Sequence, residues 1–217
     1  MEKRKTISEA AKLVKDGMTI MVGGFLGVGA PDKLLKELIK NNVKNLTLIA
    51  NDTSFVGQDY GDLIVNKMVK KAIVSHIGTN KETGKQMHSK ELEVVLTPQG
   101  TLAEQIRAGG AGLGAIVTPT GLGTVVETGK QIIEIDGNKF IVEKPLKADI
   151  ALIRASKADK NGNLIYDKAA RNFNPIMATA ADIVIVEADE IVEVGELDPN
   201  FVMTPHIFVN YIVGDDK

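Results

Sequence analysis

The chain has 217 residues, of which 44% are apolar and 25% charged, and its 26 basic and 28 acidic side chains leave a net charge of −2. These values are ordinary for a globular protein, and we expect a single domain over residues 1–217. No stretch concentrates Lys and Arg beside aromatic residues, so the composition argues against nucleic-acid binding. The absence of cysteine excludes disulfides, thiolate nucleophiles and zinc–thiolate sites.

Neither a secretory signal nor a membrane span is expected. The charged residues 1–5 lead directly into a helical pattern, without the apolar run of a signal peptide. One uncharged stretch, residues 108–126, holds six glycines and Pro119, so it is too broken and too polar to cross a membrane. We therefore expect a cytoplasmic protein with no membrane association.

The N-terminal segment predicts a helix, a buried strand and a glycine-rich turn. Thr6 and Glu9 have the spacing of a capping box at the start of a helix over residues 6–15. A short apolar run at 18–22 has the pattern of a buried strand. The segment that follows, residues 23–29, contains four glycines and is called the glycine turn below.

A second helix and strand complete a βαβ unit. Pro31 stands where a first helical residue would, and apolar residues at helical spacing follow it. Asn41 and Asn42 end this helix, and residues 46–50 form a second buried strand. A strand, turn, helix and strand in this order imply a parallel sheet.

The rest of the chain repeats this alternation with one interruption. Thr101 and Glu104 predict a capping box for a helix that two glycines at 109–110 close. Residues 131–145 break the rhythm, because apolar runs flank Asp136-Gly137 in the pattern of a β-hairpin. The fold class is therefore α/β, an open, mostly parallel twisted sheet flanked by helices, with a small β-hairpin excursion near residues 131–145. Further strands are expected at 72–75, 92–97, 115–118, 150–154, 164–166, 183–187 and 207–213, and helices at 63–66 and 174–181.

The glycine turn is the first candidate site. Ligands of open α/β sheets bind beyond the carboxyl ends of strands, and glycine lets the backbone come close to a ligand there. The N–H groups of the turn, together with the helix start after Pro31, would form an anion site. The structural alternative is that the glycines only permit a tight strand-to-helix connection.

Nucleotide-binding motifs do not match this turn. A Walker loop requires Gly-Lys followed by Ser or Thr, whereas Ala30 and Pro31 follow Gly29. A dinucleotide fingerprint requires a third glycine where Asp32 stands. Asp52, at the end of the second strand, lies near the position of a ribose-binding carboxylate, although a turn or cap residue is the structural alternative. A nucleotide-binding α/β protein, dehydrogenase-like or regulatory, therefore remains an open alternative.

Residues 16–31, DGMTIMVGGFLGVGAP, resemble the signature of the alpha subunits of family I (3-oxoacid) CoA-transferases. That signature is Asp-Gly, two residues, an apolar triplet, Gly-Gly-Phe, three residues, Gly, one residue and Pro, and every fixed position is filled. Segments 97–102 and 170–175 are also similar to the family. Segments 49–53 and 75–78 look most like acetate/acetoacetate and butyrate/acetoacetate members, and members that act on dicarboxylic substrates are a less good fit.

The resemblance implies a subunit of a hetero-oligomeric transferase with ping-pong kinetics. The family's nucleophilic glutamate lies in a Ser-Glu-Asn-Gly segment of a beta subunit, and this chain has no such segment. We therefore expect a separate beta chain and an α2β2 assembly. The expected substrates are short-chain acyl-CoA and carboxylic acids, with coenzyme A as a substrate and no cofactor or metal. Glu82 and Glu127 each precede Thr-Gly and are interpreted as turn residues.

The resemblance also implies roles for particular residues of this chain. Gln99 matches the glutamine of the family's Pro-Gln-Gly segment, and its side-chain amide would donate to the oxyanion of the thioester. A turn residue at the start of the following helix is its structural alternative. The residues expected to contact CoA are Gly23, Gly24, Phe25, Leu26, Gly27, Val28 and Gly29.

A third interpretation of the chain is a sugar-phosphate isomerase of a related open-sheet fold. Such an enzyme would require no partner chain.

Overall fold

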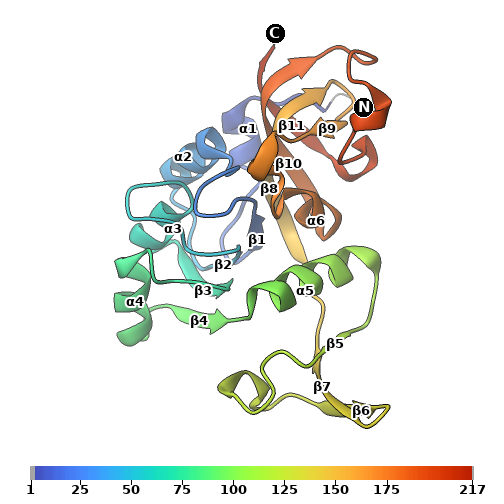
Figure 1. Cartoon of the computed structure of the whole chain (residues 1–217). Coiled ribbons are helices and arrows are strands. Elements are labelled where there is room, and N and C mark those ends of the chain that lie inside the picture. Colours follow the sequence, from blue (N-terminus) through green and yellow to red (C-terminus); the bar gives the residue numbers. More distant parts are fainter. Residues whose placement is uncertain (1–2, 217) are drawn as a thin grey trace.

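A parallel sheet forms the centre of the fold in the computed structural model, which describes residues 3–216 (Figure 1). The strand order is β11-β10-β8-β1-β2-β3-β4, and each neighbouring pair is parallel. Strand β9 pairs antiparallel with β8. The open, mostly parallel sheet expected from the sequence is thus confirmed. The strands are β1 (Thr19–Val22), β2 (Leu46–Ile49), β3 (Val69–Val74), β4 (Glu93–Leu96), β8 (Ala148–Asp159), β9 (Leu164–Ile165), β10 (Ala181–Val192) and β11 (Tyr211–Asp216).

Helices cover both faces of this sheet, because successive side chains of each strand point to opposite sides. On one face, apolar residues of the first three helices pack against alternate strand residues such as Ile20 and Leu48. On the other face, Leu102 and Met177 pack against Met21. Within residues 3–216, no helix is both long and apolar enough to cross a membrane. The helices are α1 (Ile7–Ala11), α2 (Asp32–Asn41), α3 (Gly61–Val65), α4 (Lys81–His88), α5 (Gln99–Ala111) and α6 (Asn174–Thr179), with short 3-10 turns η1 (Val125–Glu127), η2 (Lys168–Arg171), η3 (Pro199–Phe201) and η4 (His206–Phe208).

Helix α1 begins as the sequence predicts. The Thr6 hydroxyl accepts a hydrogen bond from the Glu9 N–H at 3.2 Å, and the Glu9 carboxylate accepts one from the Thr6 N–H at 2.9 Å. Asn42 ends α2 in the left-handed conformation, at φ 52°. Local side-chain chemistry is therefore sufficient to set these two boundaries.

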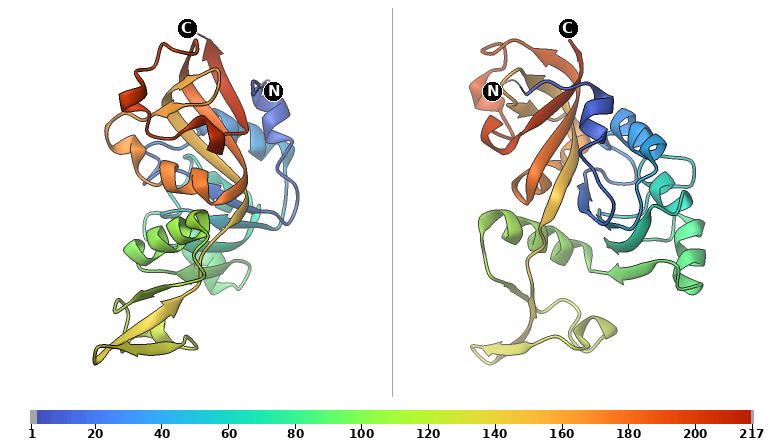
Figure 2. Two further views of the ribbon diagram at one scale, coloured as in Figure 1. Left: turned by 90° about the vertical axis from the view of Figure 1, so that its right-hand side faces the viewer. Right: turned by 180° about the vertical axis from the view of Figure 1, so that it is seen from behind.

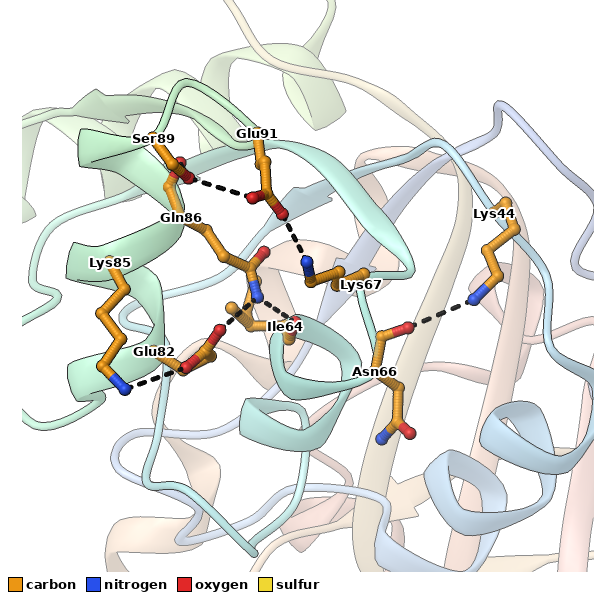
Figure 3. A network of polar contacts seen from close by, with 9 residues as sticks. All are labelled: Lys44, Ile64, Asn66, Lys67, Glu82, Lys85, Gln86, Ser89 and Glu91. Atoms are coloured by element: carbon orange, nitrogen blue, oxygen red, sulfur yellow. Dashed lines mark hydrogen bonds and ion pairs between the residues drawn. The ribbon is translucent and has the colours of Figure 1, made fainter.

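Helix α4 corrects the interpretation of residues 82–85 as a turn. Gln86 is buried and donates to the Ile64 carbonyl at 2.8 Å and to the Glu82 carboxylate at 3.0 Å, so α4 is held against α3 (Figure 3). Lys67 pairs with Glu91 at 2.6 Å beside these contacts. These polar contacts with α3 stabilise a helix whose own sequence is mostly polar, and sequence periodicity alone did not indicate it.

Helix α5 also differs from its prediction. It begins at Gln99 after Pro98, without a side-chain cap, so the expected capping box of Thr101 and Glu104 is wrong. It continues through both glycines at 109–110 and ends at Ala111, with Gly112 as a left-handed cap at φ 70°. Other segments pass too close to both glycines for a side chain to fit: a Cβ at Gly109 would lie 1.9 Å from the Leu146 carbonyl oxygen. A Cβ at Gly110 would lie 2.0 Å from the Thr179 hydroxyl oxygen at the end of α6.

Residues 113–147 leave the main body and form an arm, which projects away from the sheet in all three views (Figures 1 and 2). The predicted hairpin is present as β6 and β7. The run at 115–118 was expected to continue the main pattern, but it pairs antiparallel with β7 instead and so belongs to the arm. The arm strands are β5 (Ile116–Thr118), β6 (Ile132–Ile135) and β7 (Asn138–Glu143), in the order β5-β7-β6.

The close approach of α5 and α6 predicts an unusual effect of alanine at Gly110. In an exposed helix, Gly→Ala stabilises by about 1 kcal/mol, because alanine has the higher helix propensity. Here we expect Gly110→Ala to lower the free energy of unfolding by about 1–3 kcal/mol, because the new methyl group displaces Thr179. Gly84→Ala in α4 is the matched control, since nothing lies within 4 Å of a Cβ there. Urea unfolding measures both, and equal stabilisation by the two substitutions would contradict this packing.

Candidate functional site

The glycine turn lies at the point where the strand order of the sheet reverses. Strand β1 feeds β2, β3 and β4 on one side, whereas β8, β10 and β11 extend the sheet on the other. The Gly23 N–H donates to the Leu152 carbonyl of β8 at 2.9 Å, which joins the turn to the neighbouring strand. In open α/β sheets, the crevice beyond the carboxyl ends of strands at such a switch point is the usual ligand site.

The tip of the turn is a β-hairpin with a two-residue loop. Phe25 and Val28 exchange backbone hydrogen bonds of 3.1 and 3.0 Å. Leu26 and Gly27 between them both have positive φ, 47° and 84°, as a type I′ turn requires. A leucine in this conformation is uncommon and costs free energy, so the surrounding contacts must stabilise it. Phe25 and Val28 remain 42% and 53% exposed, so the tip presents two apolar side chains to solvent.

A fully buried carboxylate, that of Asp52, supports the hairpin from the β2 side. It accepts hydrogen bonds from the Leu26 N–H at 2.8 Å and from the Tyr60 hydroxyl at 2.8 Å. It also accepts from the Asn51 side chain at 2.7 Å and from the Ser54 N–H at 2.6 Å. Burial and the adjacent Asp52 carboxylate raise the pKa of Tyr60, so the phenol stays protonated and donates. Asp52 therefore has a structural role and is not placed to bind a ribose.

Two asparagines support the turn from the other side. The Asn172 side chain accepts from the Gly24 N–H at 3.2 Å and donates to the Val28 carbonyl at 2.8 Å. Asn174 donates to the Gly29 carbonyl at 3.1 Å. A Cβ at Gly23 would lie 1.9 Å from the Asn174 side-chain oxygen, so that position accepts only glycine without rearrangement. Sequence reasoning gave neither asparagine a role, although segment 170–175 was one of those that resembled the family.

These contacts alter the expected mode of anion binding. Backbone N–H groups of Gly23, Gly24, Phe25, Leu26 and Val28 all donate to protein acceptors. The start of α2 is occupied as well, because the buried Glu187 carboxylate accepts from the Leu34 N–H at 2.8 Å and from the Lys33 N–H. Burial raises the pKa of Glu187, and these N–H groups oppose that rise. The predicted anion site at this helix start is therefore filled by an internal carboxylate.

A cleft of about 430 Å³ lies beneath the tip, between the glycine turn and the loop before α3. Asp32 and Asp59 face each other there, and Lys36 lies on the same wall. Burial, then the shared hydrogen bond and the charge of Asp32, raise the pKa of Asp59 to about 7. The Asp59 carboxyl therefore keeps its proton over much of the acidic range. A Cβ at Gly27 would lie 2.0 Å from an Asp59 oxygen, so this pair forms the underside of the turn.

Gln99 lies at the same edge of the sheet but apart from the turn. It is the first residue of α5, immediately after β4, and its side chain is exposed without a hydrogen-bond partner among residues 3–216. Two strands separate β4 from β1, and at about 4.8 Å per strand the two elements are about 14 Å apart. The structure thus aligns the two predicted parts of the site along one edge without bringing them into contact. A ligand with a long extended arm would be needed to reach both.

The three histidines form no site. His76, His88 and His206 are exposed on separate elements. Among residues 3–216, no group of three or more His, Asp or Glu side chains could hold a metal ion.

The sequence has close relatives of known family. The family model described as Coenzyme A transferase matches residues 4–215. The chain is 57% identical to a protein of Escherichia coli strain K12 named acetate CoA-transferase subunit alpha, over 97% of this chain and 96% of that protein. It is 53% identical to the acetoacetyl-CoA:acetate/butyrate CoA transferase alpha subunit of Clostridium acetobutylicum, over 92% of this chain and 91% of that protein.

Solved structures show the same fold at low sequence identity. An acyl-CoA transferase of Escherichia coli O157:H7, solved as a thioester complex with CoA, matches with a TM-score of 0.89 and 22% identity. The match covers 99% of this chain but 47% of that one, so this chain spans about half its length. Glutaconate coenzyme A-transferase from Acidaminococcus fermentans matches with a TM-score of 0.87 and 22% identity, over 99% of this chain and 76% of that one.

The raised pKa of Asp59 predicts a pH-dependent stability. A carboxyl group of ordinary pKa 3.8 that rises to about 7 on folding binds its proton more tightly in the folded state. The stability it contributes is present at low pH and is lost as the pH rises from about 4 to about 7. We expect Asp59→Asn to flatten this dependence and to raise the melting temperature at pH 8 by about 2–4 °C. Asp136→Asn, in the exposed turn between β6 and β7, controls for loss of one charge. The same slope in wild type and Asp59→Asn would contradict the raised pKa of Asp59.

Proposed function

The chain belongs to the coenzyme A transferase family, and from this premise we propose that it is the alpha subunit of a short-chain acid CoA-transferase. Such an enzyme moves coenzyme A between an acyl-CoA and a free carboxylic acid. The observation that carries the proposal is the glycine turn at the switch point, together with the absence of a Ser-Glu-Asn-Gly nucleophile segment in the sequence. The chain then supplies a binding surface, and a beta subunit supplies the reacting glutamate.

The proposed reaction consists of two half-reactions. A glutamate carboxylate of the beta subunit attacks the thioester carbonyl carbon, which gives an acyl–glutamyl anhydride and frees the CoA thiolate. The thiolate attacks the glutamyl carbonyl, releases the first carboxylate and forms a glutamyl-CoA thioester. A second carboxylic acid then accepts CoA by the reverse steps, so the kinetics are ping-pong.

This chain contributes the glycine turn, Gln99 and Lys36 to that reaction. Its glycine turn, residues 23–29, presents Phe25 and Val28 to the coenzyme, and recognition there depends on shape because most N–H groups of the turn are already used. Gln99 presents an unpaired amide that would donate to the oxyanion of each tetrahedral intermediate. Lys36, beneath the tip, is a nearby cation for a phosphate of the coenzyme.

Relatives guide the choice of substrates and assembly. The two alpha subunits named above act on acetate and on acetoacetyl-CoA with acetate or butyrate, so we propose acetyl-, butyryl- or acetoacetyl-CoA as donor. We also propose an α2β2 assembly, a cytoplasmic location and no cofactor. None of these four details depends on the geometry of the turn.

The structure argues against the nucleotide-binding alternative, and an assay distinguishes the isomerase alternative. A nucleotide-binding protein would need the Asp52 carboxylate for a ribose, but that group is 0% exposed and has four donors within the chain. A sugar-phosphate isomerase would be active without a partner. Binding of NAD by the isolated chain would support the first, and isomerase activity of the isolated chain would support the second.

A transfer assay with acetoacetyl-CoA and acetate tests the proposal. The purified chain alone should be inactive, and the chain co-produced with the product of its neighbouring gene, as the candidate beta chain, should be active. Activity of the single chain would mean that the nucleophile lies within it. An assembled pair that is inactive across several short-chain acids would contradict the transferase function.

Gln99→Ala in the active pair tests the oxyanion role. We expect kcat to fall by about 10²–10³-fold with little change in assembly, because one donor to the transition state is lost. Gln99→Glu keeps the size but removes the amide donor, and it should be at least as slow. An unchanged kcat in both variants would contradict the oxyanion role, and Gln99 would then be only the first residue of α5.

A further inference from the structure

One face of the arm is apolar and uncovered. In the paired strands, Val117 lies opposite Val142, and Phe140 lies opposite Ile133. Ile135 follows two residues along β6, so it shares their face. No residue of this set is fully buried, and Val117 and Ile135 are 43% and 44% exposed. These five residues are called the apolar arm face below.

The opposite face of the arm is covered by the chain itself. Ile141 points to that side and is 0% exposed, and the loop over residues 119–130 folds against it. A Cβ at Gly121 would lie 2.7 Å from Val126 and 3.5 Å from Ile141, which shows how closely this loop packs. The loop of the arm therefore covers one face, whereas the other face leaves Val117 and Ile135 exposed and Ile133, Phe140 and Val142 partly exposed.

The arm is held firmly at its root. Glu143, which is 3% exposed, pairs with Lys130 at 2.6 Å and accepts from Gln105 of α5 at 3.2 Å. These contacts join the end of β7 to both the loop of the arm and the main body. The apolar arm face is therefore presented in a defined position relative to α5 and Gln99.

A hollow of about 640 Å³ lies between the arm and the first turns of α5. Val117 of the apolar arm face lines it on one side, and Gly100 and Glu104 of α5 line it on the other. Gly100 follows Gln99 directly. A molecule that covers the apolar arm face and enters this hollow therefore comes next to the residue that must meet the nucleophile.

From this continuity we propose that the beta subunit docks on the apolar arm face and fills the hollow against α5. The inference rests on the proposed function, in which the glutamate must reach the vicinity of Gln99 from another chain. A second copy of this chain would not fulfil that need, because the alpha sequence lacks the nucleophile segment. A three-stranded sheet with one apolar face open to water gains stability when another molecule covers it.

Charged substitutions on the apolar arm face test the docking. The double variant Val117→Asp/Ile135→Asp should pair with the beta chain at least about 100-fold more weakly, because each charge must be desolvated at the interface. Val194→Asp/Ile207→Asp is the matched control, since these residues are 56% and 73% exposed on segments distant from the arm (Figure 1). Analytical ultracentrifugation measures pairing, and thermal unfolding of each isolated variant checks its fold.

Hydrogen exchange on the unmodified pair gives an independent readout. Addition of the beta chain should slow exchange in β5, β6 and β7. Normal pairing of Val117→Asp/Ile135→Asp, or unchanged exchange in the arm, would overturn the proposal. It would also be overturned if the variant abolished a dimer of this chain and left pairing with beta intact. Transfer activity is measured separately from pairing. An assembled but inactive pair would contradict the transferase function alone. An active pair whose assembly is unchanged by the arm substitutions would contradict the docking alone.

Discussion

The buried carboxylate of Asp52 is the interaction on which the candidate site depends. A buried carboxylate is costly unless donors surround it, and here four donors do so. One of them is the N–H of Leu26, a residue with positive φ that would not hold this conformation unaided. Asp52 thus fixes the tip of the glycine turn to the end of β2, and Asn172 and Asn174 hold it from the opposite side. The turn is ordered before any ligand arrives, which lowers the entropic cost of binding.

The N–H groups that are already hydrogen-bonded within the chain also limit how the turn could bind a coenzyme. Glu187 occupies the start of α2, and protein acceptors occupy most N–H groups of the turn. Anion binding by backbone N–H groups, the usual property of a glycine turn before a helix, is therefore largely unavailable here. What the turn offers is an exposed apolar tip over a cleft lined by Lys36 and by Asp59, whose pKa is raised. In our account this surface receives the coenzyme, the beta subunit closes over α5 and the arm, and the reaction takes place between them.

The sequence predicts the sheet well and the site in part. Strands β1 and β2 and the cap of α1 follow from local pattern, because apolar runs and capping side chains act over a few residues. Helix α4 and the glycines inside α5 could not be predicted locally, since contacts with α3 and with Thr179 determine them. Motif resemblance located the glycine turn and Gln99. It could not show that Asp52 binds the Leu26 N–H instead of a ribose, or that Glu187 occupies the helix start where an anion was expected. These contacts join residues 26 and 153 positions apart.

The most direct test of the central claim is the affinity of the assembled enzyme for acyl-CoA when Phe25 is truncated. Phe25→Ala should weaken binding about tenfold, because the apolar tip loses its largest contact surface. Phe201→Ala is the matched control, at a phenylalanine that is 63% exposed on η3. Weaker binding in Phe25→Ala alone, with assembly intact, is the result that our account predicts. Equal affinity in the two variants and the wild type would contradict it, because the glycine turn would then not be the surface that receives the coenzyme.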